Sequence, residues 1–130
     1  MLKQLIPILF VGMGGFVGAT SRYVISSQVQ QLNKGIFFPW GTVSVNLLGC
    51  LIFGVLIQLN DMFHTFSPEM KNFVFIGILG AFTTYSTFSN DAMNLILDHR
   101  YTASIVYIMG HLFVGLFAVF MGRYVVRLFL

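Results

Sequence analysis

Charged residues are scarce in this sequence. Only 8% of its 130 residues are Asp, Glu, Lys or Arg, whereas 57% are hydrophobic, and the mean hydropathy is +0.86. In a soluble domain about a quarter of the residues are charged. The composition therefore excludes an ordinary soluble domain and predicts a membrane-embedded protein, and the length allows one domain, residues 1–130.

Cysteine and clustered basic residues are also lacking. Cys50 is the sole cysteine, which excludes an intrachain disulfide, and no metal-ligand spacing surrounds it. The net charge is +3 and the basic residues are scattered, so nothing supports nucleic-acid binding. Lys3 precedes an apolar run, as in a signal peptide, but the run continues to Val17 without a clear cleavage site. A first transmembrane helix is the better interpretation.

Long apolar runs are what the sequence does contain. They predict an all-α protein with four transmembrane helices, over about residues 5–25, 41–59, 72–97 and 101–122. The third run is interrupted after Phe82 by a segment with five Ser or Thr hydroxyls and two aromatic rings: Thr83, Thr84, Tyr85, Ser86, Thr87, Phe88 and Ser89. Exposing these groups to lipid would be costly, so we expect them to face protein or an aqueous path. The alternative is that the hydroxyls bond back to carbonyls one turn earlier and only bend a helix.

Other polar residues in the spans also have two interpretations. Arg22 follows the small-residue pair Gly14 and Gly18 on one face, and it either snorkels to the headgroups or forms a buried cation. Asn46 lies well inside the second span, either as interhelical glue worth about 0.6–2 kcal/mol or as an amide lining a pathway.

The fourth span carries a polar stripe. Tyr107, His111 and Gly115 are spaced i, i+4 and i+8, so they share one face of a helix. A lone histidine inside a membrane is often a satisfied structural residue. Beside Tyr107, however, His111 becomes a pathway candidate.

The distribution of positive charge suggests an oligomer. Four spans place Lys3, Lys71, Arg123 and Arg127 on one side, and Arg22, Lys34 and Arg100 on the other. Four against three is nearly no bias, whereas the positive-inside rule needs a clear one. Four helices are also too few to enclose an aqueous pathway and shield all these polar faces from lipid. We therefore expect an antiparallel homodimer of oppositely oriented copies, as in an inverted repeat.

No carboxylate lies at the centre of any span, since Asp61, Glu69 and Asp98 fall in loops and Asp91 just beyond the polar segment. A proton-coupled multidrug carrier of this size would need such a carboxylate, so its absence argues against that class. Hydroxyl and amide donors without acidic groups favour a small anion as the transported species. A non-transporting membrane scaffold, whose polar faces only hold helices together, is the other alternative.

Three motifs resemble the Fluc-type fluoride channels. They are Gly14-Gly15-x-x-Gly18-Ala19-x-x-Arg22-Tyr23, Gly41-Thr42-x-x-Val45-Asn46-x-x-Gly49, and Gly80-Ala81-Phe82-Thr83-Thr84-Tyr85-Ser86-Thr87-Phe88-Ser89. They occur in the family's order and extend over essentially the whole chain, and the third motif is highly specific.

The resemblance implies a passive fluoride exporter of the microbial inner or plasma membrane, which lowers cytoplasmic fluoride toxicity and is not an enzyme. It implies a dual-topology antiparallel homodimer with two pores. It also implies a structural sodium ion at the dimer interface, bound by the backbone carbonyls of Gly80 and Thr83 at the break in the third helix. By the same resemblance the fluoride pore is lined by Asn46, Tyr85, Ser86, Thr87, Phe88, Tyr107 and His111, and Arg22 and Asp91 have structural or pore-mouth positions.

The sequence departs from the family pattern at three positions. Tyr85 stands where phenylalanine is usual, which adds a hydroxyl beside the expected path. Gly115 leaves the end of the polar stripe without a side-chain donor, and Ala81 replaces a second glycine and would stiffen the break.

Overall fold

The protein is all-helical. The computed structural model describes the backbone of residues 2–130 and the side chains of residues 5–130, so the side chain of Lys3 lies outside the described part. The elements are α1 (Leu2–Leu32), α2 (Trp40–Phe63), α3 (Pro68–Lys71), the π-helix η1 (Asn72–Leu79), α4 (Gly80–Phe82), α5 (Tyr85–Leu97) and α6 (Tyr101–Phe129). Residues 2–130 contain no strand, which confirms the predicted all-α class.

Three of the helices are long and apolar enough to cross a membrane. They are α1 from Leu5 onward, α2 and α6. The third apolar run of the sequence is divided: α3, η1 and α4 follow one another to Phe82, and α5 begins only at Tyr85. α1 also continues past the predicted span to Leu32, because its last turns are rich in glutamine, which is polar but favours a helix.

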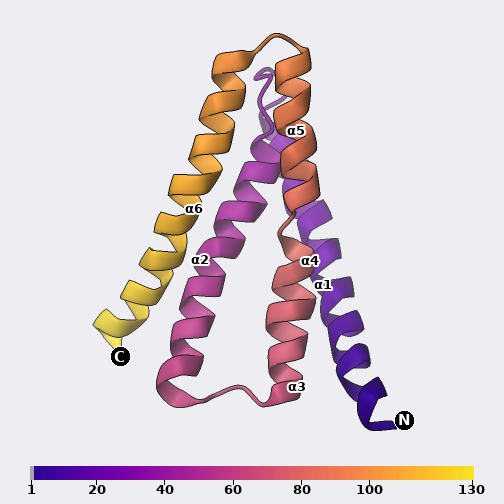
Figure 1. The fold of residues 1–130 in the computed structure, drawn as a ribbon, viewed down its shortest axis with the longest axis vertical. Coiled ribbons are helices and arrows are strands. Elements are labelled where there is room, and N and C mark those ends of the chain that lie inside the picture. The colour runs from indigo at the N-terminus through magenta and orange to yellow at the C-terminus, as the bar shows by residue number, and fades with distance from the viewer. Residues whose placement is uncertain (1) are drawn as a thin grey trace.

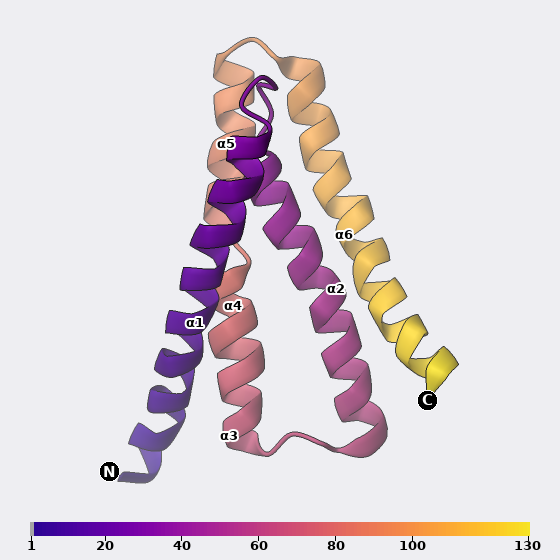
Figure 2. The same cartoon turned by 180° about the vertical axis from the view of Figure 1, so that it is seen from behind.

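The helices run up and down between two ends of the molecule. Both termini and the α2–α3 loop lie at one end, and the α1–α2 connector and the α5–α6 turn lie at the other (Figure 1). Seen from behind, α1 lies beside η1 and α4, while α6 lies beside α2 (Figure 2). Thus α2 stands between η1 and α4 on one side and α6 on the other, whereas α5 contacts α6 directly.

Glycines allow the closest helix contacts. A side chain at Gly14 or Gly18 of α1 would collide with the backbone of η1, as their spacing predicts. A side chain at Gly54 of α2 would collide in the same way with the backbone of α6 at Val119. These contacts fix the distances of α1 and α6 from the centre of the molecule.

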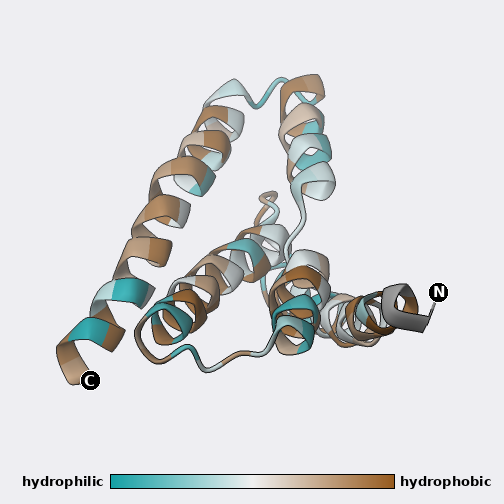
Figure 3. Ribbon diagram, turned by 60° about the horizontal axis from the view of Figure 1, so that its bottom comes forward, coloured by the Kyte–Doolittle hydropathy of each residue, from teal (hydrophilic) through white to brown (hydrophobic). Residues whose placement is uncertain are grey.

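Much of the apolar surface faces outward. α6 is mainly hydrophobic along its length, whereas the more hydrophilic residues gather on α5 and at helix ends (Figure 3). Phe16 of α1 is 75% exposed and Phe113 of α6 is 64% exposed. Outward apolar rings are expected where lipid, rather than water, surrounds the helices.

Candidate functional site

The site is built around an interruption between two helices. Thr83 (φ −86°, ψ 158°) and Thr84 (φ −149°, ψ 119°) have extended backbone between α4 and α5. Thr84 caps α5, since its hydroxyl oxygen accepts a hydrogen bond from the Thr87 N–H (3.3 Å) and its hydroxyl donates to Thr87 Oγ1 (3.0 Å). The side chain of Thr84 therefore sets where α5 begins.

Asn46 of α2 binds the same residue from the other side. Its Nδ2 donates to the Thr84 carbonyl (3.1 Å), and its Oδ1 accepts from the Thr84 N–H (2.8 Å). Gly49, one turn further along α2, lets the two segments approach, because a side chain there would collide with Thr83. The Thr84 N–H and carbonyl lie outside any helix and would otherwise be unpaired in an apolar setting. Asn46 satisfies both of them.

The interruption changes the partners of two carbonyls. In a continuous α-helix the Gly80 carbonyl would accept from the Thr84 N–H, and the Thr83 carbonyl from the Thr87 N–H. Here the first of these N–H groups donates to Asn46 and the second to the Thr84 hydroxyl. The Gly80 and Thr83 carbonyls thus lose their usual helical donors. Carbonyl oxygens of this kind suit a hard cation.

A groove of about 610 Å³ opens beside the interruption, between α2, the segment from η1 to α5, and α6. Its lining comprises Asn46, Leu47, Gly49, Cys50, Phe53, Phe75, Leu79, Gly80, Thr83, Thr84, Tyr85, Phe88, Ile108, His111, Leu112 and Val119. None of these described residues is Asp, Glu, Lys or Arg. The groove is therefore apolar, with a few polar groups concentrated at the interruption and at His111.

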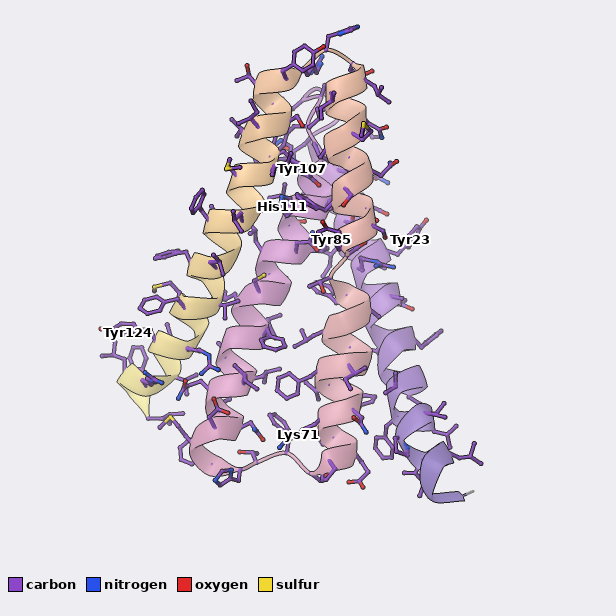
Figure 4. All side chains as sticks on the ribbon, in the orientation of Figure 1. Tyr23, Lys71, Tyr85, Tyr107, His111 and Tyr124 are labelled. Carbon is purple, nitrogen blue, oxygen red and sulfur yellow. The ribbon has the colours of Figure 1, made fainter. Side chains whose placement is uncertain are left out.

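Aromatic rings gather at one wall of the groove. The Phe88 ring centroid lies 4.7 Å from that of His111 and 5.4 Å from that of Tyr107, and Tyr107 and His111 are 4.4 Å apart. Tyr85 is 5.7 Å from Phe88. Tyr85, Tyr107 and His111 lie at neighbouring levels between α5 and α6 (Figure 4). The cluster joins the N-terminal half of α5 to the middle of α6.

Asp91 lies on the far side of Tyr107. Its Oδ2 accepts hydrogen bonds from the Thr42 hydroxyl (2.6 Å) and the Tyr107 hydroxyl (3.2 Å). It lines a second hollow of about 620 Å³ near the α1–α2 connector, together with Ser26, Lys34, Asn94 and Asp98 among others. Tyr107 itself is only 1% exposed, so its side chain separates this hollow from the groove.

The predicted site residues are therefore distributed over several places. Asn46, Tyr85, Phe88 and His111 line the groove, as do Gly80 and Thr83. Ser86 and Thr87 are exposed on α5, Tyr107 is buried, Asp91 lines the second hollow, and the half-buried Arg22 of α1 is in the lining of neither.

Part of the hydroxyl run follows the simpler of its two interpretations. The Thr83 hydroxyl donates to the Leu79 carbonyl (2.9 Å), and the Ser89 hydroxyl donates to the Tyr85 carbonyl (3.0 Å). Each hydroxyl thus bonds to the carbonyl four residues earlier, which is the pattern of hydroxyls that bend a helix.

Two residues matter more than the sequence indicated. Thr84 caps α5 and is hydrogen-bonded to Asn46, and the Thr42 hydroxyl donates to the carboxylate of Asp91. Threonine is one of the preferred residues at the position before a helix, and this capping preference is the signal that would have marked Thr84. Thr42 shares a helix face with Asn46, but no sequence signal pairs it with Asp91.

Comparison with known proteins gives one family. A family model described as CrcB-like protein, Camphor Resistance (CrcB), matches residues 9–123. A fluoride-specific ion channel FluC of Shewanella halifaxensis (strain HAW-EB4) is 39% identical over 119 residues, which are 92% of this chain and 94% of that protein. A protein of the same name from Chlorobium phaeobacteroides (strain BS1) is 34% identical over 128 residues, 98% of each chain.

Proposed function

Because this chain belongs to the CrcB-like family, whose relatives above are named fluoride-specific ion channels, we propose that it conducts fluoride passively across the cell membrane. It is a multi-pass membrane protein and not an enzyme. Movement of fluoride down its electrochemical gradient exports the ion and lowers its concentration in the cytoplasm of a microbial cell.

The observation that carries this proposal is the interruption at Thr83 and Thr84, which starts α5 at the wall of an uncharged groove. A helix N-terminus presents backbone N–H groups and a partial positive charge, both of which favour an anion. Since the lining has no carboxylate, nothing there repels fluoride strongly. The edges of the Tyr85 and Phe88 rings add partial positive charge.

Fluoride is small and strongly hydrated, so a narrow path must replace its water with close donors. The residues of that path are Asn46, Tyr85, Ser86, Thr87, Phe88, Tyr107 and His111. Ser86 and Thr87 present hydroxyls from α5, and Asn46 keeps one N–H beyond the one that it donates to Thr84. Arg22 and Asp91 would have structural or pore-mouth positions outside that path.

A second copy of the chain completes the path. We take α3 to α5 as the fourth crossing, a transmembrane helix broken at Thr83 and Thr84. Tyr85 is 81% exposed in the single chain, and Ser86 and Thr87 beside it are exposed too. Hydroxyls facing lipid are costly, so this face needs protein or water against it. In an antiparallel homodimer each copy covers this face of the other, and the two covered faces form two pores.

The interruption is also where we propose a structural sodium ion. The Gly80 and Thr83 carbonyls, which lose their helical donors, would hold the ion at the dimer interface, with equivalent carbonyls from the second copy. Bound there, the ion would supply a positive charge that fixes the two breaks against each other.

The test is fluoride efflux from liposomes that contain this purified chain alone, with a potassium ionophore to dissipate the voltage. We expect rapid loss of fluoride without loss of chloride, measured with ion-selective electrodes, and no loss from protein-free liposomes. Absence of efflux from folded and assembled protein would contradict the proposal and leave the scaffold alternative.

A further inference from the structure

The hydrogen bond of His111 determines which of its ring nitrogens carries a proton. His111 Nδ1 lies 3.0 Å from the carbonyl oxygen of Tyr107. A carbonyl oxygen only accepts, so Nδ1 must carry the hydrogen. In a neutral imidazole the other nitrogen, Nε2, then has a lone pair and no hydrogen.

Nε2 has no partner. Its atom is buried, and within the described part of the chain it makes no hydrogen bond. His111 lines the groove that contains the interruption at Thr83 and Thr84. A buried nitrogen left unpaired in a native structure requires an explanation, and a position beside an ion path suggests a ligand.

The neutral ring is a poor fluoride ligand, because the Nε2 lone pair repels an anion. A protonated ring presents an Nε2–H donor and a positive charge at the same point, both favourable to fluoride. The rings of Phe88 and Tyr107 lie 4.7 Å and 4.4 Å from the His111 ring, centroid to centroid, and hold it in place beside the groove.

The other ionisable groups near His111 come from the two helices that pack on α6. From α2, Cys50 lines the same groove, and from α5 Tyr85 does so. The carboxylate of Asp91, on α5, accepts hydrogen bonds from the Tyr107 and Thr42 hydroxyls. Tyr107 therefore lies between this carboxylate and His111. None of these groups bonds to Nε2 within the described part of the chain, so none of them supplies or accepts its proton there.

We propose that His111 is a proton-dependent fluoride ligand: the ring takes up one proton when fluoride occupies the groove beside it. This inference rests on the proposed fluoride path. The proton comes from the aqueous phase and returns to it when the ion leaves, so no bond is made or broken apart from that N–H. Coupling of this kind is reciprocal, so protons promote fluoride binding and fluoride promotes proton uptake.

The coupling predicts pH-dependent conduction. Imidazoles change charge between about pH 5 and 8, and one linked proton changes occupancy by at most about tenfold per pH unit. Fluoride efflux from liposomes at equal pH inside and outside should therefore rise as the pH is lowered from about 8 to 6. Protein-free liposomes at each pH give the background from hydrogen fluoride that crosses the lipid unaided.

Three variants separate His111 from other sources of pH dependence. His111→Ser keeps a donor hydroxyl that does not titrate, so any efflux that this variant supports should be flat over this range. His111→Phe keeps an aromatic ring without a donor and should conduct little at any pH. His99→Gln is the matched control, since His99 lies in an exposed turn against Tyr101, and it should retain the wild-type dependence.

A second measurement does not depend on conduction. Sodium fluoride added to weakly buffered protein in detergent should remove protons from solution, detected with an indicator dye, whereas sodium chloride should not. His111→Ser should abolish this uptake and His99→Gln should keep it.

The outcomes distinguish the two proposals. Efflux that is flat with pH in the wild type, or still pH-dependent in His111→Ser, would overturn the role of His111 and leave the channel intact. Absence of proton uptake in the wild type would do the same. No fluoride efflux from wild-type protein at any pH would overturn the channel and, with it, the ligand.

Discussion

Replacing Asn46 by alanine would remove both hydrogen bonds that join α2 to the interruption. The Thr84 N–H and carbonyl would lose their partners at 2.8 Å and 3.1 Å, in an apolar part of the molecule. Side-chain hydrogen bonds between membrane helices average about 0.6 kcal/mol and reach about 1.7 kcal/mol each. Two of them give a loss of about 1–3 kcal/mol in the free energy of unfolding.

The matched control lies on the same helix. The Ser44 hydroxyl donates to the Gly41 carbonyl within α2 (2.8 Å), so Ser44→Ala removes a hydrogen bond that joins no other element. Its cost should remain within about 0.5 kcal/mol. The sole tryptophan, Trp40, begins α2, and its fluorescence can follow unfolding by a denaturing detergent in both variants.

Hydrogen exchange gives the local result. Asn46→Ala should accelerate exchange of the Thr84 amide, whereas Ser44→Ala should leave it unchanged. We also expect Asn46→Ala to keep the dimer and lose fluoride flux, while a scaffold protein would lose its assembly. Equal unfolding free energies for the two variants, with equal exchange at Thr84, would refute the role of Asn46 as the tie at the interruption.

Two further predictions concern the aromatic cluster and the α2–α6 contact. Phe88→Ile should abolish or greatly reduce fluoride flux with dimer assembly intact, because it removes the ring that contacts His111 and Tyr107; normal flux would exclude the ring from the mechanism. Gly54→Leu should lower the free energy of unfolding by at least about 1–3 kcal/mol, the usual cost of overpacking, since a side chain there meets the backbone of α6. Gly110→Ala, with open space around it, should be neutral or slightly stabilising in the same detergent titration.

Composition and hydropathy were sufficient for the all-α membrane class. The apolar runs also located the helices, because lipid-facing residues must be apolar whatever they pack against. Helix ends were less predictable: the glutamines near the end of α1 look like a connector by polarity but continue the helix to Leu32. Hydropathy predicts which residues lie in the bilayer, whereas capping residues and helix propensity determine where a helix ends.

The partners within the site could not be read from the sequence. Asn46 and Thr84 are 38 positions apart, and Thr42 and Asp91 are 49 apart. Each pair depends on how far α2 is rotated and shifted relative to α5, which no local pattern encodes. The same limit applies to the π-helix η1, whose residues after Asn72 are apolar or glycine and carry no signal for a wider turn. The roles of the pore residues and the sodium ion stay predictions.

The pairing of Asn46 with Thr84 has a mechanical consequence. A gap in a helix ordinarily serves as a hinge, since its backbone dihedrals are free of the helical ladder. Here the N–H and carbonyl on either side of one Cα are both fastened to α2, so turning that residue requires breaking two bonds together. The gap is a rigid corner. An ion at this corner would meet dipoles already in position and would not have to reorganise them, so a stationary wall could replace a hydration shell without a moving gate.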